Sequence, residues 1–471
     1  MASREPHYKS KITPYVFACW ILAAFGGLMF GYDIGISGGV TAMDDFLVKF
    51  FPHVHERKLH AQEDNYCRYD DELLQLFTSS LYLAALIASF FASKACTKLG
   101  RKPTITMAST FFIAGAFICA AAEKKWMIIV GRILFGVGVG FANEVGIFIA
   151  NLVNYATVMI HPSGWRVSLG LAAVPALVLF GGSLFITETP PSLVEMGRKE
   201  EGREALRIIR GVDDVDAEFD QILAAAEQAK QGKHHFRRLF KRSSFPPLFV
   251  GTIIQVFQQF TGINAIMLYA PVLFRTLGFN SNASLLSSVI TGLVNVGATF
   301  VSIYAVDKIG RRKLLLQASC QMFVSQMAIG VILSTHLQAT GTMSKGMAAV
   351  VVILVCMFVM SFAWSWGPMG WLIPSEIFPI ETRAAGFAFA VSTNMTFTFV
   401  IAQAFLSMLC HMRAHIFFFF SAWIMAMGLF VLYLLPETKG IPIDQVEERL
   451  WKKHPVWSSF YKEEGSEYGM A

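Results

Sequence analysis

The hydrophobic positions of this chain fall into runs of about 20 residues, separated by shorter polar segments. A bilayer core about 30 Å thick needs roughly 20 helical residues, so these runs predict membrane-spanning helices. The first part of the chain has clear spans at 15–36, 73–95 and 103–122. The second part has six, at 246–273, 284–306, 313–335, 347–372, 384–409 and 416–435.

The segment between the two parts has a different pattern. Residues 197–242 contain 11 Lys or Arg and 9 Asp or Glu residues, and 200–210 and 217–230 read as amphipathic helices. Lys and Arg concentrate on the cytoplasmic side of membrane proteins, and the turn 94–102 is also basic. We therefore expect a cytoplasmic linker and cytoplasmic N- and C-termini.

The two parts echo each other. Segment 98–102, Lys-Leu-Gly-Arg-Lys, matches 308–312, Lys-Ile-Gly-Arg-Arg, and 187–190 resembles 436–439. Parallel repeats of six spans are typical of transporters that hold substrate near the bilayer midplane between the repeats. The expected organisation is an N-terminal helix bundle at 1–189, a linker at 190–245, a C-terminal bundle at 246–436 and a cytoplasmic tail at 437–471.

Composition agrees with an all-α polytopic membrane protein, because 54% of the 471 residues are hydrophobic and only 15% are charged. The net charge of +6 reflects basic loops and indicates no nucleic-acid surface. The seven cysteines lack metal or redox spacing, and no nucleophile–base constellation is seen. We expect neither an enzyme nor a cofactor. Nothing in the pattern indicates an oligomeric state.

The segment 255–264 carries amides at bilayer depth. Gln255, Gln258 and Gln259 are spaced i, i+3 and i+4, so a helix would project them from one face, with Asn264 beyond. Amides both donate and accept hydrogen bonds, which suits a neutral ligand rich in hydroxyls. The alternative is hydrogen bonding between helices.

Six short motifs span nearly the whole chain, at 30–35 (Phe-Gly-Tyr-Asp-Ile-Gly), 131–134 (Gly-Arg-Ile-Leu), 255–264, 307–312 (Asp-Lys-Ile-Gly-Arg-Arg), 374–379 (Pro-Ser-Glu-Ile-Phe-Pro) and 436–440 (Pro-Glu-Thr-Lys-Gly). They resemble the motifs of the sugar porters of the major facilitator superfamily, most closely the plant-type monosaccharide–proton symporters. The resemblance implies a fold of two six-helix halves.

The first half is shorter than the second. Gly310 and Glu437 are 127 positions apart, whereas Gly100 and Glu188 are 88 apart. The family's Ser-Glu…Arg-Gly loop between spans 4 and 5 and its Phe-Gln-Leu motif are absent, so we place a missing block at Val145/Gly146. The 35 residues that follow Trp126 either form one fused crossing, giving eleven spans and reversing all later ones, or a short re-entrant hairpin.

The resemblance also assigns roles to individual residues. Asp33 would be the proton site and Arg132 its partner, although a static structural ion pair is the alternative reading. Sugar ligands would be Gln258, Gln259, Asn264, Asn295, Trp371 and Asn394.

At the cytoplasmic ends, Arg101, Arg311 and Arg312 would pair with Glu376, Glu437 or Glu188 as a gate that holds the outward-facing state. Part of this basic pattern is also explained by the positive-inside rule, under which basic residues only orient the chain in the membrane.

Two further features are expected on the outer side. The resemblance implies that Cys67 and Cys410 form a disulfide between the halves. Residues 282–284 are a glycosylation sequon in an expected outer loop.

We therefore expect a symporter that moves a monosaccharide such as glucose inward with a proton, in the plasma membrane. The alternatives are a transport-inactive truncated isoform and, less favoured, a sugar sensor that signals through its short linker.

Overall fold

The computed structural model describes residues 13–59, 67–138, 145–158, 160–231, 239–276, 281–336, 344–379, 382–441 and 445–461. Every regular element within these ranges is a helix. Nine helical segments of the described residues are long and apolar enough to cross a membrane. The predicted all-α membrane fold is confirmed.

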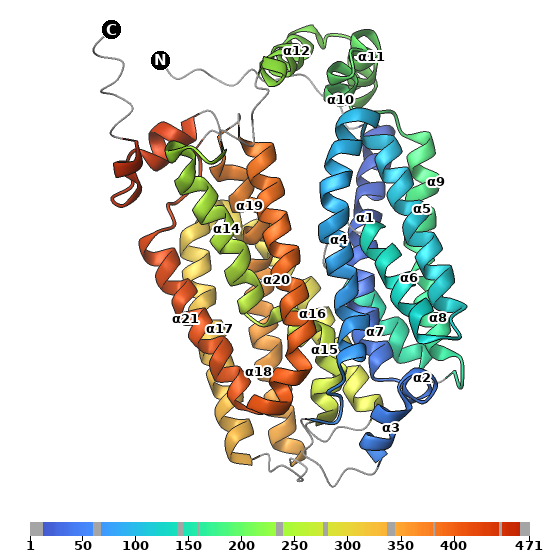
Figure 1. Ribbon diagram of the computed structural model, residues 1–471. Coiled ribbons are helices and arrows are strands. Elements are labelled where there is room, and N and C mark those ends of the chain that lie inside the picture. Colours follow the sequence, from blue (N-terminus) through green and yellow to red (C-terminus); the bar gives the residue numbers. More distant parts are fainter. Residues whose placement is uncertain are drawn as a thin grey trace.

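The N-terminal bundle contains three long helices, two pairs of short helices, and two further short helices that follow the first long one (Figure 1). Its elements are α1 (Pro14–Thr41), α2 (Asp44–Phe50), α3 (Pro52–Leu59), α4 (Glu72–Leu99), α5 (Arg101–Ala120), α6 (Lys125–Gly138), α7 (Val145–Thr157), α8 (Gly164–Leu171) and α9 (Ala173–Phe185).

The second bundle lies beside the first (Figure 1). It contains α14 (Phe245–Phe260), α15 (Ile263–Thr276), α16 (Ser281–Ile309), α17 (Arg311–His336), α18 (Lys345–Trp364), α19 (Trp366–Ile377), α20 (Arg383–Met412) and α21 (His415–Tyr433). The linker forms α10 (Pro190–Glu195), α11 (Lys199–Arg210) and α12 (Asp216–Gln231) at one end of the molecule, close to the amphipathic segments predicted. We call this end the linker side.

Local chemistry explains where several helices begin and break. Pro14 occupies the first turn of α1, and the Thr13 hydroxyl accepts a hydrogen bond from the amide N–H of Val16 at 3.2 Å. Gly262 separates α14 from α15 with a φ of +82°, a conformation that favours glycine. The predicted span 246–273 is therefore a broken helix, as is typical of transporter binding regions.

The segment between α5 and α8 forms two short helices, α6 and α7, that enter and leave the bundle on the same side. Helices α6 and α7 have 14 and 13 residues, which gives each a length of about 20 Å. The start of α6 and the end of α7 both lie on the side away from the linker. Arg166 of α8, the helix that follows α7, donates to the carbonyl oxygens of Ala120, at the end of α5, and Ala122, in the turn before α6. Residues 139–144, which join the two helices, lie outside the described residues.

The rest of the chain keeps its orientation. The backbone N–H of Arg101, at the turn between α4 and α5, donates to Glu188 Oε1 at 2.9 Å. The end of α9 therefore lies on the linker side with that basic turn. The fused crossing, which would reverse every later helix, is wrong, and the hairpin alternative describes the structure.

One loop prediction is also wrong. Residues 282–284 fall in the first turn of α16, and the buried Ser284 hydroxyl donates to the carbonyl oxygen of Pro271. A sequon needs an accessible, flexible backbone, so this segment is a poor glycosylation acceptor.

Candidate functional site

Three of the predicted amides meet between α14, α19 and α20. Asn394 Nδ2 donates to Gln255 Oε1 at 2.6 Å and to Gln258 Oε1 at 2.7 Å. Gln255 Nε2 donates to the carbonyl oxygen of Gly370 at 2.5 Å, and Gln258 Nε2 to those of Trp366 and Gly367 at 3.1 and 3.2 Å. All three side chains are buried. In this conformation the three side chains form hydrogen bonds between helices, which is the alternative to a sugar site that the sequence analysis left open.

Gln259 and Asn264 form a second amide pair, across the break after α14. Asn264 Nδ2, on α15, donates to Gln259 Oε1, on α14, at 2.6 Å, and within the described residues neither side chain bonds to a helix outside this broken span. Asn264 is only half-buried. This pair therefore keeps more free hydrogen-bonding capacity than the first cluster.

The remaining two predicted sugar ligands do not join these amides by hydrogen bonds in the described part of the chain. Asn295 is buried on α16, which packs against α15. Trp371 on α19 is half-buried, with its ring centroid 6.3 Å from that of Phe387. An indole that is only partly buried can stack on a sugar ring.

Asp33 and Arg132 form a fully buried ion pair between α1 and α6. Arg132 Nε also donates to the carbonyl oxygen of Phe77 at 3.0 Å, and the guanidinium lies 5.1 Å from the centroid of the Phe77 ring. Asp33 Oδ2 has no hydrogen-bond partner among the described residues. The short hairpin has therefore not moved Arg132 away from Asp33.

A set of polar contacts that the sequence analysis did not find leads from this pair into the second bundle. Arg132 Nη2 donates to the carbonyl oxygen of Thr78 at 3.4 Å, and Thr78 Oγ1 lies 2.5 Å from the hydroxyl of Tyr269. The Tyr269 hydroxyl donates to the carbonyl oxygen of Ala402 at 2.9 Å. Tyr269 belongs to α15, so it joins the ion pair to the broken span that carries the amides. Isolated polar residues inside apolar runs were the only signal of these positions.

Contacts between the two bundles cluster away from the linker. Besides Thr78–Tyr269, Ser79 Oγ donates to Gln403 Oε1 at 2.5 Å, and Asn151 Nδ2 donates to the carbonyl oxygen of Ser288 at 3.1 Å. Cys67 and Cys410 are joined in a disulfide on the same side. Two more hydrogen bonds between the bundles lie in this half of the molecule, from Gln403 Nε2 to the carbonyl oxygen of Glu72 at 3.3 Å and from Ser407 Oγ to Asp70 Oδ1 at 2.8 Å.

We predict that reducing the Cys67–Cys410 disulfide lowers stability without removing the fold. The bond links residues 343 positions apart, and long closed loops restrict the unfolded chain most, by roughly 2–4 kcal/mol. Thermal unfolding of purified protein should shift downward equally for C67S, for C410S and for the unsubstituted chain in reductant. A further shift when C67S is reduced would contradict this reason.

The repeated basic turns are built alike. Gly100 and Gly310 have φ values of +97° and +94°, and an added Cβ would lie 2.5 and 2.9 Å from a carboxylate oxygen of Glu188 and Glu437, respectively. Each carboxylate accepts from the two backbone N–H groups after its glycine. Glycine thus lets each acid cap the next helix closely.

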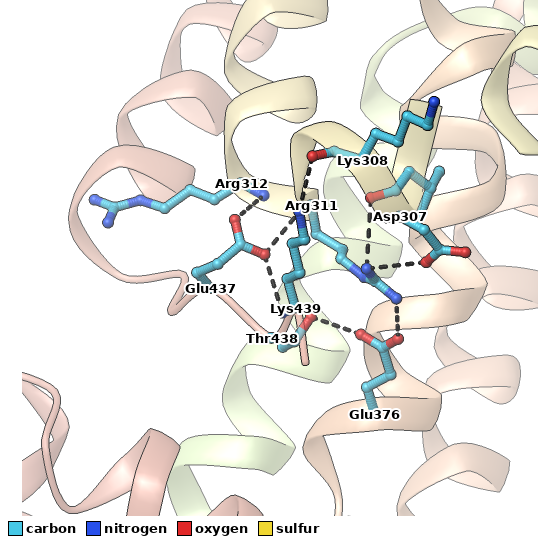
Figure 2. Close-up of polar contacts among 9 residues, drawn as sticks. Asp307, Lys308, Arg311, Arg312, Glu376, Glu437, Thr438 and Lys439 are labelled. Atoms are coloured by element: carbon cyan, nitrogen blue, oxygen red, sulfur yellow. Dashed lines mark hydrogen bonds and ion pairs between the residues drawn. The ribbon is translucent and has the colours of Figure 1, made fainter. Parts of the chain in front are cut away.

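The second turn carries an additional ion pair (Figure 2). Arg311 Nη2 lies 2.8 Å from Glu376 Oε1, and Thr438 Oγ1 donates to Glu376 Oε2 at 2.6 Å. The backbone N–H groups of Arg311 and Arg312 donate to Glu437, and the backbone N–H of Arg101 donates to Glu188 in the same way. All these contacts stay within one half, so they hold helices of a bundle together in this conformation.

We predict that E188Q destabilises the N-terminal bundle at neutral pH by about 1 kcal/mol, because charge-assisted hydrogen bonds at a partly exposed site are lost. Partial burial acts to raise the pKa of Glu188, but the N–H groups of Lys102, Thr189 and Arg101 lower it overall. A lowered carboxyl pKa stabilises the fold above the ordinary carboxyl range. This stabilisation is lost as the pH falls through the folded-state pKa. The difference in unfolding temperature between E188Q and the unsubstituted chain should therefore shrink on acidification; a difference independent of pH would contradict the charge argument.

Comparisons with known proteins agree with this architecture. The family model described as "Sugar (and other) transporter" matches residues 19–145 and 142–450. Sugar transport protein 8 of Arabidopsis thaliana is 57% identical over 484 residues, covering 97% of this chain and 96% of the relative. Sugar transport protein MST4 of Oryza sativa subsp. japonica is 55% identical, covering 96% and 93%.

Solved structures share the fold. The xylose transporter XylE from E. coli, in a partially occluded inward-open conformation, superposes with a TM-score of 0.74 at 22% identity, covering 91% of this chain and all of XylE. The family match itself divides at residues 142–145, where the sequence analysis places a missing block.

Proposed function

Because this chain belongs to the family of sugar transporters, we propose that it is a proton-coupled monosaccharide symporter that works by alternating access. The observation that carries the proposal is the buried Asp33–Arg132 pair, linked through Thr78 and Tyr269 to the helices that bear the amides. A buried carboxylate with one partner and one free oxygen can exchange a proton and change its packing.

The conformation fits an inward-facing state. The bundles are joined away from the linker, and the basic linker and turns are cytoplasmic by the positive-inside rule. In this orientation both termini are cytoplasmic, and the closed side faces the cell exterior at the plasma membrane.

The ion pair is the form expected after the proton has left toward the cytoplasm. When Asp33 is protonated in the outward-facing state, its attraction for Arg132 falls. Arg132 can then rely on the carbonyl oxygens of Phe77 and Thr78, which it already contacts. Because Thr78 lies against Tyr269, a shift of α4 is transmitted to α15.

The amides supply the sugar site in this proposal. Gln259 and Asn264 bond only within the broken span in the described part of the chain, while Gln255, Gln258 and Asn394 would exchange bonds between helices for sugar hydroxyls. Such an exchange would loosen α14 from α19 and α20 and couple binding to the change of state. Asn295 and Trp371 would complete the site from α16 and α19.

We predict that Q259A raises the KM for glucose about three- to tenfold, with little change in the maximal rate. The loss corresponds to roughly 1 kcal/mol for hydrogen bonds to a neutral ligand. Concentration-dependent uptake measures this, with Q317A as the control because Gln317 is exposed on α17. Equal KM values for Q259A and Q317A would show that Gln259 does not contribute to sugar binding.

A specific observation favours a second candidate, the transport-inactive isoform. Helices α6 and α7 are each too short to cross the membrane, so the N-terminal bundle has an incomplete wall. We propose that a block is missing between them. A protein without this block would insert and fold but move sugar slowly or not at all.

Uptake of labelled glucose at several external pH values, in cells lacking their own hexose carriers, tests the proposal. Symport predicts uptake that rises as the medium is acidified. Background uptake, with the protein confirmed at the cell surface, would reject transport and favour the inactive isoform.

A further inference from the structure

The N-terminal bundle contains a cavity of about 880 Å³ in its linker-side half. Its walls come from α1 between Cys19 and Met29, from Ile105 and Ala108 of α5, and from the end of α9. Gly138 of α6 and Ile149 of α7 also line it. The cavity therefore lies beside α1, next to the end of α6 and the first turns of α7.

The lining is almost wholly apolar. Its polar groups are the thiol of Cys19 and the hydroxyl of Ser183, which already donates to the carbonyl oxygen of Phe180 at 2.7 Å and lies 2.9 Å from Thr106 Oγ1. A sugar or a cluster of waters would find few hydrogen-bond partners there. Hydrocarbon is the chemistry that fits.

The first helix is unusually uncovered around this cavity. Only 25% of the most apolar stretch of α1 is buried, compared with 33–56% for the other candidate spans of the described residues. Phe17, Trp20 and Phe185, near the linker-side end, are exposed. The cavity wall is thus continuous with a surface that faces the bilayer.

The linker-side end of the cavity is positively charged. Lys102 lies one turn before Ile105, and its Nζ donates to the carbonyl oxygen of Leu184 at 3.0 Å, beside the lining residue Ser183. The side chain of Arg101 is exposed. The nearby carboxylate of Glu188 is already satisfied by backbone N–H groups. Two cations beside the linker-side end of an apolar cavity match an anionic lipid.

We propose that an anionic phospholipid of the linker-side leaflet binds here, with an acyl chain in the cavity and its phosphate at Lys102 and Arg101. The lipid replaces part of the wall that full-length fourth and fifth spans would provide. This site does not depend on transport, so its test is separate from that of the proposed function.

Native mass spectrometry of purified protein titrated with phosphatidylglycerol or phosphatidylcholine tests the site. The unsubstituted chain should retain one phosphatidylglycerol at least tenfold more tightly than phosphatidylcholine. A108W, which fills the cavity, should lose this lipid, whereas M107W should keep it because Met107 is the exposed neighbour. Replacing Lys102 and Arg101 by Ala should remove the preference for phosphatidylglycerol, while K98A should preserve it. Equal retention by A108W and M107W, or equal binding of both lipids, would overturn the proposal.

A measurement on the unsubstituted chain guards against misfolding of A108W. Phosphatidylglycerol with a photoreactive group near the end of its acyl chain should crosslink to the lining segments of α1, α5 and α9. Crosslinks confined to the outer surfaces of other helices would overturn the proposal. A Cys19–Cys19 dimer, formed by oxidation in membranes, would also overturn it, because a second copy would then occupy the cavity.

Discussion

D33N should abolish sugar accumulation against a gradient and remove the dependence of uptake on external pH. The substitution keeps the shape of the side chain but removes the proton-binding charge that pairs with Arg132. Without this charge, the proton gradient has no group on which to act, so we expect at least a tenfold loss of concentrative uptake. Exchange of sugar at equal concentrations should be affected less, because it needs no net proton movement.

The control is D220N, which removes a carboxylate from the exposed face of α12. It should leave both uptake and its pH dependence unchanged at equal surface expression. If D33N accumulates sugar as well as D220N does, the Asp33–Arg132 pair is only a static structural contact.

Inserting the missing block between Val145 and Gly146 should raise the rate of glucose uptake at least tenfold. The donor would be the corresponding segment of Sugar transport protein 8, a relative 57% identical to this chain. The insertion would allow α6 and α7 to cross the full bilayer, instead of the roughly 20 Å that each spans. Two complete helices would close the wall beside α1 and let the bundle rotate as a rigid body.

An equally long insertion at Gly211, in the turn between α11 and α12, provides the control for added length. It should not raise uptake. If the block at Val145 also leaves uptake unchanged in surface-expressed protein, the short hairpin does not limit transport.

Much of this architecture follows from local sequence pattern. Long apolar runs and basic turns place most spans to within a few residues, because helix length is set by the bilayer. The turns at Gly100 and Gly310 have similar sequences and therefore similar structures. In each turn a carboxylate, from Glu188 or Glu437, lies against the glycine.

Other features depend on packing that no short segment encodes. The i, i+3, i+4 pattern puts Gln255 and Gln258 on one face, but only the fold determines that α19 and α20 satisfy them. The link from Arg132 to Tyr269 joins positions 137 apart through Thr78, an ordinary threonine in sequence. The hairpin could be stated only as one of two alternatives, because both fit the same 35 residues.

The most direct measurement of the central claim uses purified protein in liposomes with a pH gradient, acidic on the side away from the linker. The account predicts that labelled glucose accumulates above its external concentration and that a protonophore collapses the accumulation. Glucose that only equilibrates, or does not enter, would contradict proton-coupled transport by this chain.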